Sequence, residues 1–292
     1  MWQGLEDFLV GKHYFFSTEL IKTNFCDMRI LKNIMLLSFC FISMGIFAQT
    51  TKGLLSKKGD TEISRKLERK FKRDAARLAL RMEADKEELR YQNIIIAPGN
   101  VENIYQALVN VYKSDETAQS IAKCNVHTFP NPSIDNFKVI FDKTVDWAIP
   151  LQQGVSETDS DEINDLLDEY NLVISKHVQW NNTQDAITIR SKVPLNMAAL
   201  SNEFYNIEGV AEIDLGVPTI AGNDIKIERM EKGWELEYIL QFGSYSDKAK
   251  KHVWKYKVTD DGEVTFISET GDPIPTWMKC EDDVNNWMVN RI

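Results

Sequence analysis

The side chains that could do acid–base or metal chemistry are few and far apart in this sequence. His127, His177 and His252 follow residue 48, and none lies one helical turn from a second ligand, as a His-Glu-x-x-His zinc motif requires. Cys124 and His127 have a metal-like spacing, but zinc is held by three or four such ligands and this set stops at two. We therefore expect core or loop roles for these residues, and no metal or cofactor.

The motifs of the common catalytic sites are also missing from the sequence. It contains no Gly-x-Ser-x-Gly elbow, no phosphate-binding loop and no dinucleotide glycine fingerprint. Asp159, Asp161 and Glu162 cluster where a helix is predicted to begin, and the helix dipole favours negative charge there. The run at 260–263 lacks the spaced oxygen ligands of a calcium loop and predicts a hairpin turn. These patterns favour a protein that is not an enzyme. An enzyme whose site only the fold assembles is the less favoured alternative.

Tryptophan remains as a candidate binding residue, because exposed tryptophans on a sheet face are typical of carbohydrate or protein binding. Strand alternation places Trp234 on the side of Leu236, and Trp254 on the side of Tyr256, which predicts core positions for both. The further candidates are Trp180, Trp277 and Trp287.

Residues 28–48 have the pattern of a secretory signal peptide. Met28 opens a short basic segment that carries Arg29 and Lys32, and the apolar run at 34–47 holds no charge. That run has the length of a signal segment and is shorter than the roughly 20 residues a spanning helix needs.

A small residue ends the apolar run, which predicts cleavage between Ala48 and Gln49. Residues 1–27 are then an over-extended start. The alternative is an uncleaved membrane anchor that leaves residues 1–27 in the cytoplasm. Cleavage predicts export to the periplasm, the outer membrane or the exterior.

The predicted mature chain, 49–292, is long enough for one large domain or two small ones. The net charge is −10, and residues 1–48 hold four basic and four acidic residues, so the mature charge is the same. A chain this acidic is not a nucleic-acid binder as a whole. Its two cysteines, Cys124 and Cys280, could form one disulfide in an oxidising compartment. Two unpaired buried thiols are the alternative, because a sequence does not fix the distance between them.

Residues 49–90 are predicted to form a linker and a charged amphipathic helix capped by Asp60 or Thr61. Apolar residues recur along it at spacings of three and four, and its first part is strongly basic. The basic residues are Arg65, Lys66, Arg69, Lys70, Lys72, Arg73, Arg77 and Arg81. A surface helix or a short self-pairing coil accounts for this pattern. The alternative is that the basic stripe at 60–82 contacts anionic lipid or cell-wall polymer.

The rest of the chain predicts an α+β fold with a ferredoxin-like module. A helical lead-in occupies 91–135, and two prolines make 129–132 a rigid turn. Within 136–220 the predicted order is strand, helix, two hairpin strands, helix and strand, the βαββαβ arrangement. The predicted ranges are 137–141, 161–170, 173–180, 186–190, 197–205 and 210–215. An antiparallel β-meander is predicted at 221–275, followed by a tail at 276–292.

Residues 137–217 resemble the inhibitor-like prodomains of subtilisin-family proteases. The resemblance is carried by the helix at 161–170 and by the segments Ala199-Leu200-Ser201 and Ile207-Glu208-Gly209-Val210-Ala211-Glu212-Ile213. It implies the ferredoxin-like fold and a role as inhibitor or folding assistant. The sequence departs from that family because no protease domain or protease motif follows, and because Pro218 leads into the meander where a prodomain's inhibitory tail would continue.

Most of the predicted mature chain is similar to uncharacterised exported proteins common in Bacteroidota. The segments that carry this similarity are 105–112, 126–133, 234–243 and 252–258. Several of those proteins hold cysteines in the loop after the Phe-Gly pair, whereas this chain has 244–247 as Ser-Tyr-Ser-Asp. The similarity implies export far more than activity. The sequence thus favours a non-enzymatic exported protein that binds a protein or envelope partner, with a stand-alone protease inhibitor or folding assistant as the alternative.

Overall fold

The computed structural model describes residues 62–216, 218, 222–243 and 249–278. The chain divides into a unit at 1–57 and a unit at 58–292, and all described residues belong to the second. The predicted cleavage site at Ala48 and Gln49 lies outside them, as do the leader and the predicted tail beyond residue 278.

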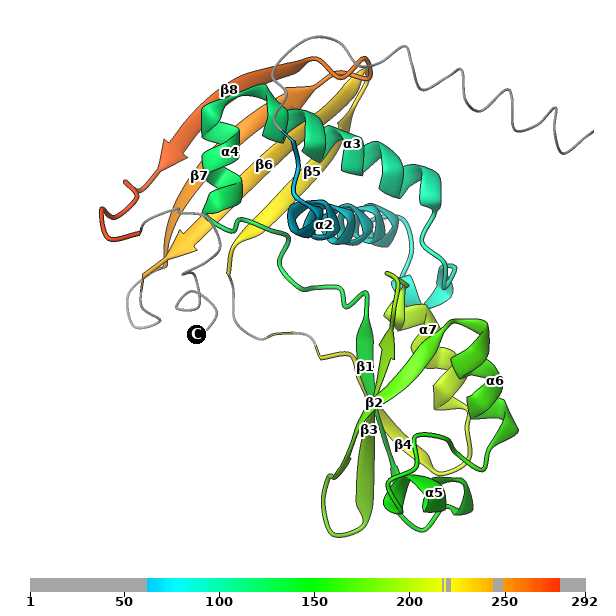
Figure 1. The fold of residues 1–292 in the computed structure, drawn as a ribbon. Helices are drawn as coiled ribbons and strands as arrows, with labels where there is room; N and C mark the ends of the chain where they lie inside the picture. Colours follow the sequence, from blue (N-terminus) through cyan, green and yellow to red (C-terminus); the bar gives the residue numbers. More distant parts are fainter. Residues whose placement is uncertain (1–61, 217, 219–221, 244–248, 279–292) are drawn as a thin grey trace, which may run out of the picture. The chain divides into compact units, whose positions relative to one another are not determined.

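The described residues form an α+β fold, as predicted, with helices and two four-stranded antiparallel sheets (Figure 1). In chain order the elements are α2 (Arg65–Ala84), η1 (Leu89–Tyr91), α3 (Pro98–Ser114), α4 (Glu116–Lys123), β1 (Asn136–Asp142), η2 (Asp146–Ala148), α5 (Ile149–Gln152), α6 (Asp161–Glu169), β2 (Leu172–Gln179), β3 (Gln184–Ser191), α7 (Met197–Tyr205), β4 (Val210–Asp214), β5 (Asp224–Met230), β6 (Gly233–Phe242), β7 (Lys250–Val258) and β8 (Val264–Gly271). We call β2-β3-β1-β4 the central sheet and β5-β6-β7-β8 the C-terminal sheet.

Helix α2 is shorter at both ends than the sequence pattern predicts. It begins at Arg65, because the Ser64 hydroxyl accepts a hydrogen bond from the Leu67 N–H at 3.2 Å and so caps the first turn. The expected caps at 60 and 61 are therefore wrong. It ends at Ala84 rather than near residue 90. Acidic residues follow Ala84, and the negative end of the helix dipole disfavours negative charge there.

Helix α3 begins at Pro98, where the sequence pattern predicts a stop. Proline is tolerated in the first turn because its missing N–H would have no partner there in any case. The preceding Ile94–Ile96 segment is a loop, with Ile95 exposed and Ile96 buried. Helix α4 follows at once and is capped by Asp115, whose carboxylate accepts the Ala118 N–H at 2.7 Å.

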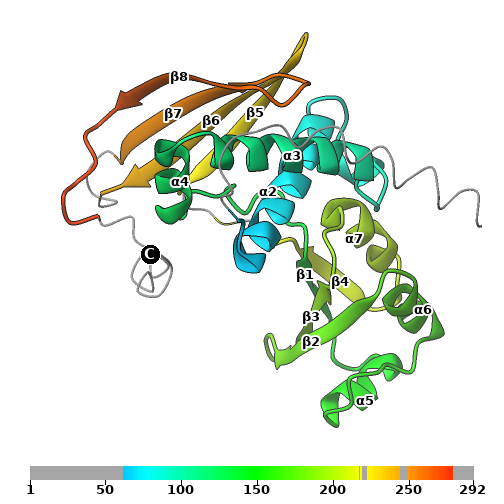
Figure 2. The same ribbon diagram turned by 45° about the horizontal axis from the view of Figure 1, so that its top comes forward.

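The N-terminal helices and the C-terminal sheet share one hydrophobic core, here the first core. Figures 1 and 2 show α2, α3 and α4 along one face of β5 to β8. Leu78 of α2 and Leu108 of α3 are fully buried in it with Leu236 of β6 and Tyr256 of β7. Further along the chain, Ile274 and Met278 also pack against this core.

The central sheet has a second core of its own. Every neighbouring pair of its strands is antiparallel, and α6 and α7 lie on one face (Figures 1 and 2). Ser160 and Asn196 cap these helices, which begin where the predicted ranges begin. Alternate residues of β1, such as Phe137 and Phe141, point into the second core, and the residues between them define an outer face.

The short elements η2 and α5 between β1 and α6 have no counterpart in the sequence prediction. They carry Trp147 and Leu151 into the second core, and the Trp147 indole N–H donates to the Glu208 carbonyl at 2.9 Å.

In sequence, the residues of the central sheet are inserted between two segments that build the first core. First-core residues occur up to Ile134 and again from Ile225, whereas the second core is built from 137–215 with Ile94 packed against it. The chain therefore leaves the first core, builds the central sheet and returns.

Candidate functional site

The three described histidines each contact a carboxylate, but in three separate places. His127 Nδ1 lies 2.6 Å from Asp74 Oδ2, and His177 Nε2 lies 3.1 Å from the Asp185 carboxylate on the neighbouring strand β3. His252 Nε2 lies 2.9 Å from a carboxylate on β8. Within the residues that the structure describes, no three His, Cys, Asp or Glu side chains gather in a way that could hold a metal ion.

Histidines 127 and 252 differ in how their second ring nitrogen is used. The Nε2 atom of His127 is buried with no hydrogen-bond partner among the described residues. Both nitrogens of His252 face acceptors, because Nδ1 lies 2.7 Å from the Asp272 carbonyl oxygen and Nε2 lies beside Glu269 Oε1.

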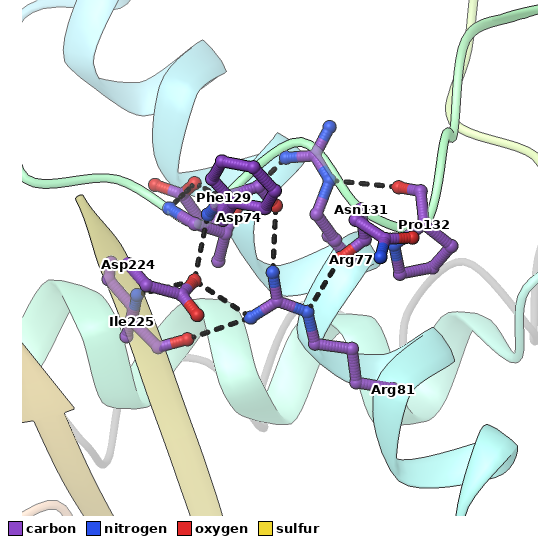
Figure 3. Close-up of polar contacts among 9 residues, drawn as sticks. Asp74, Arg77, Arg81, Phe129, Asn131, Pro132, Asp224 and Ile225 are labelled. Atoms are coloured by element: carbon purple, nitrogen blue, oxygen red, sulfur yellow. Dashed lines mark hydrogen bonds and ion pairs between the residues drawn. The ribbon is translucent and has the colours of Figure 1, made fainter. Parts of the chain in front are cut away.

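The basic stripe of α2 is partly used inside the molecule, as Figure 3 shows. Asp74 is 2% exposed and accepts hydrogen bonds from the Thr128 N–H and hydroxyl at 2.9 and 2.7 Å. Arg77, also buried, donates to the Thr128 hydroxyl at 2.8 Å and to the Pro132 carbonyl at 3.0 Å. Burial lowers the pKa of the Arg77 guanidinium, and the nearby Asp74 charge opposes that effect.

Arg81 continues this network one turn further along α2 (Figure 3). Its guanidinium donates to the Phe129 and Asn131 carbonyls at 2.7 and 2.9 Å. It also contacts Asp224 Oδ1 at 2.8 Å and the Ile225 carbonyl at 3.1 Å. The same Asp224 oxygen accepts the Phe129 N–H at 2.7 Å. The chain entering the central sheet and the chain leaving it are thus held together at the C-terminal half of α2.

Several of the basic side chains proposed for lipid contact therefore have protein partners. Arg73 pairs with Asp135 at 2.5 Å, and Lys72 pairs with Glu68 at 2.7 Å. Arg77 and Arg81 belong to the network above. No described helix is long and apolar enough to cross a bilayer.

Only one of the two cysteines of the predicted disulfide lies within the described residues. Cys124 is 7% exposed and takes part in a disulfide, whereas Cys280 lies outside the described residues, so their pairing stays a prediction. Of the tryptophans, Trp254 is buried in the first core and Trp234 packs against it, as strand alternation predicts. Trp180 and Trp277 are different, because they are 47% and 69% exposed, and Trp287 lies outside the described residues.

Trp180 stands on the outer face of the central sheet. This face is formed by the residues of each strand that alternate with the second-core residues. They are Lys138 and Ile140 of β1, Val173, Lys176 and Val178 of β2 with Trp180 after it, Ala186, Thr188 and Arg190 of β3, and Glu212 and Asp214 of β4. Ile140 and Ala186 are each only 1% exposed, yet they belong to neither core.

The Trp180 ring leans over the centre of this outer face. The Lys138 ammonium lies 5.2 Å from its centroid, although Lys138 is on β1 and Trp180 follows β2, with β3 between them. The ammonium and the ring therefore meet above β3. In the register of the sheet, the buried Ile140 and Ala186 stand between Lys138 and Trp180.

Lys138 is fixed from its other side. Its ammonium donates to Asp214 Oδ2 at 2.7 Å across the β1–β4 pair. That bond, with the Gly216 N–H that donates to Oδ1 at 2.8 Å, lowers the pKa of the Asp214 carboxyl. Trp180, Lys138 and Asp214 thus form a row that crosses the outer face and presents one side of the indole to solvent.

Sequence reasoning singled out Trp180 as a candidate and could not choose between a core and a binding position for it. Its side chain projects from the end of a hairpin strand, where alternation alone does not tell which neighbours it meets. The available signal was the small Ala186 among larger β3 residues, since a large ring needs such a gap to lie across a strand.

No protein-family model matches this chain, no curated protein matches it, and no solved structure matches it. The two resemblances drawn from the sequence therefore stay predictions.

Proposed function

We propose that this is an exported, non-enzymatic protein of the cell envelope or exterior that binds a protein partner on the outer face of a ferredoxin-like central sheet. The observation that carries the proposal is Trp180, half exposed and held over apolar residues by Lys138. Val173 adds a second exposed apolar side chain on the same face.

Such a surface has the features of an interface hot spot. A tryptophan whose position is fixed before binding loses little side-chain entropy when a partner covers it. The exposed Lys176 and Arg190 stand on the same face, and no ion pair of theirs is found within the described residues. A partner with an apolar side chain beside an acidic one would complement this surface.

A protein suits this face better than a sugar does. Sugar recognition needs convergent polar groups that are free to bond hydroxyls, whereas Lys138 and Asp214 beside the ring are bonded to each other. The neighbouring β2 residues Val173 and Val178 are apolar. Oligosaccharide binding is the outcome of the test below that would contradict the proposal.

A prodomain-like inhibitor is the second candidate, favoured by the strand order β2-β3-β1-β4 with both helices on one face. That order is the one expected of the βαββαβ arrangement. Its test is inhibition of a purified subtilisin-type protease by the whole chain, with Trp180→Ala as the comparison variant. Inhibition that the substitution abolishes would support this role, and unchanged protease activity at high protein concentration would exclude it.

The partner site is tested by photo-cross-linking in native cells. A photoreactive residue replaces Val173, which leaves Trp180 in place, and a matched one replaces Lys257 on the outer face of the C-terminal sheet. We expect a discrete protein adduct from position 173, loss of that adduct in the Trp180→Ala background, and none from position 257. Equal adducts from both positions, or a glycan adduct alone, would overturn the proposal.

Export is tested separately, by cell fractionation and N-terminal sequencing. A soluble or outer-membrane-associated chain that begins at Gln49 is the expected result. A membrane-bound chain that keeps its leader would contradict export with cleavage.

A further inference from the structure

The two described sheets have four edge strands, β2, β4, β5 and β8. An edge strand presents unpaired backbone N–H and C=O groups that can pair with another strand, and proteins usually block this with charges, bulges or short strands. Three of the four edges follow that rule. Strand β5 carries Lys226, Glu228 and Arg229, β4 has five residues with two carboxylates, and β2 has a bulge at Ser175 followed by Lys176.

Strand β8 has a bulge, as β2 does, but it lacks the charges and the short length that protect the other edges. It runs for eight residues, and its single charged side chain, Glu269, is held by His252. Phe266 and Ile267 are 45% and 46% exposed, and among the exposed large apolar residues of the described part they are the only two adjacent in sequence. Thr265 and Thr270 add further strand-favouring residues.

The bulge in β8 makes the apolar exposure larger. Lys255 of β7 pairs with Ser268 and Tyr256 pairs with Phe266, so Ile267 is the extra residue with no partner on β7. In β2 the corresponding extra residue is Ser175. An extra residue that is polar suits a solvent-facing edge, whereas an exposed isoleucine gains free energy when it is covered.

We propose that β8 is a self-association edge, at which two copies of this chain pair antiparallel about a two-fold axis near Ile267. This inference does not rest on the proposed partner site.

A two-fold pairing of β8 with itself is free of charge conflict. With Ile267 on the axis, Phe266 of one copy faces Ser268 of the other, Thr265 faces Glu269, and Val264 faces Thr270. No two carboxylates face each other, which matters for a chain with a net charge of −10. The two Ile267 side chains meet at the axis, and the sheets join into one.

The pairing is expected to be weak. One strand edge buries much less than the roughly 1,200–2,000 Å² of a stable complex, so association is expected only at high local concentration. Backbone hydrogen bonds supply most of the contact, and the Phe266 and Ile267 side chains supply the apolar part.

Sedimentation velocity over a broad concentration series tests this on the purified full chain. The wild-type chain is expected to shift reversibly from monomer to dimer as concentration rises. Ile267→Lys brings two ammonium groups together on the axis and is expected to weaken the dimer about tenfold or more. Ile267 has no partner on β7, so the variant is expected to keep its fold, which circular dichroism checks.

Three controls keep the result attributable to β8. Met230→Lys places the same charge on the opposite edge, β5, and is expected to leave dimerisation unchanged. Trp180→Ala is likewise expected to leave it unchanged. Ile267→Cys is expected to give a cross-linked dimer under mild oxidation. A chain that stays monomeric throughout, a dimer insensitive to Ile267→Lys, or a dimer lost in Trp180→Ala would each overturn the inference.

Discussion

The outer faces of the two sheets present different surfaces, although helices cover the other face of each. On the C-terminal sheet, charges of both signs stand side by side. Glu237 of β6 lies between Lys226 of β5 and Lys255 of β7 in the register of the sheet. The central sheet instead holds the buried Ile140 and Ala186 between Lys138 and the exposed Trp180. The charged part of the C-terminal sheet's outer face is solvated, although Ile239 on the same face is 8% exposed, whereas Trp180 leaves exposed aromatic surface that a partner can cover. The two sheets therefore differ mainly in their outer faces: that of the C-terminal sheet is largely charged, and that of the central sheet is a candidate docking surface.

The largest expected effect tests whether the centre of the central sheet's outer face is dry. Ile140→Glu places a carboxylate where the side chain is 1% exposed, and the Lys138 ammonium on the same face is already paired with Asp214. An uncompensated buried charge lowers the free energy of unfolding by about 3–5 kcal/mol. Urea denaturation measures this.

The matched control is Thr265→Glu, which puts the same carboxylate on the outer face of the C-terminal sheet opposite Lys257. Its expected effect on the free energy of unfolding is within about 0.5 kcal/mol. If Ile140→Glu lost as little as this control, the two outer faces would not differ as described.

Removing the indole should expose what lies beneath it. Trp180→Ala loses roughly half of the ring's burial, and we expect the free energy of unfolding to fall by about 2 kcal/mol. Trp180→Phe should retain most of the stability, because a smaller ring still covers Ala186. Thermal and urea unfolding of the two variants check this order, and equal stability of both with wild type would show that the ring covers nothing.

The contact between Lys138 and Asp214 is expected to make the stability depend on pH. Lys138 and the Gly216 N–H lower the pKa of Asp214, so the stability that this carboxylate contributes is present above the pKa of the unfolded chain and is lost as pH falls through the folded pKa. Because the pair is more than one-third exposed, the contribution is a fraction of a kcal/mol at most.

Lys138→Met is expected to raise the pKa of Asp214 toward its ordinary value, as measured by NMR titration of the side-chain carboxyl carbon. Asp142 provides an internal control, because the N–H and hydroxyl of Thr144 lower its pKa and Lys138 plays no part. A variant in which both titrations stay unchanged would remove Lys138 from its assigned role.

The smallest effect is expected on the C-terminal sheet. Lys255 Nζ lies 3.7 Å from Glu235 Oε1, a partly exposed pair, and Lys255→Ala is expected to change the free energy of unfolding by less than about 0.5 kcal/mol. A loss above about 1 kcal/mol in urea denaturation would mean that this face also depends on specific contacts.

The local elements of this fold were largely predictable from sequence. Ser160, Asn196 and Asp115 each cap a helix through a bond to a backbone N–H three residues on, a signal contained within one turn. The hairpin at Asn181 was equally local, because its side-chain oxygen accepts the N–H groups of Thr183 and Gln184.

The contacts that join distant segments were not predictable. Arg77 meets Thr128 across 51 positions and Arg81 meets Asp224 across 143, so a basic helix that looked solvated in sequence proved to hold two loops. The shared first core was not predictable either, because it joins segments that are far apart in sequence. The periodicity within α2 does not indicate that β6 and β7 cover it. The position of Trp180 was unpredictable because its ring passes over one strand to reach the next.

The clamp at Arg81 and Asp224 also bears on the order in which the chain can fold. Phe129 and Asp224 touch across 95 positions, and closing an unstructured loop of that length costs about 4 kcal/mol in chain entropy. Every strand of the central sheet lies inside that loop, so the sheet can begin to form before the first core does, although Ile94 from outside the loop packs against the second core. Once the central sheet has formed, it brings the two ends of the loop close together. Contacts within the central sheet then offset most of the entropy cost of closing the loop. Folding of the central sheet first would therefore speed assembly of the domain that surrounds it.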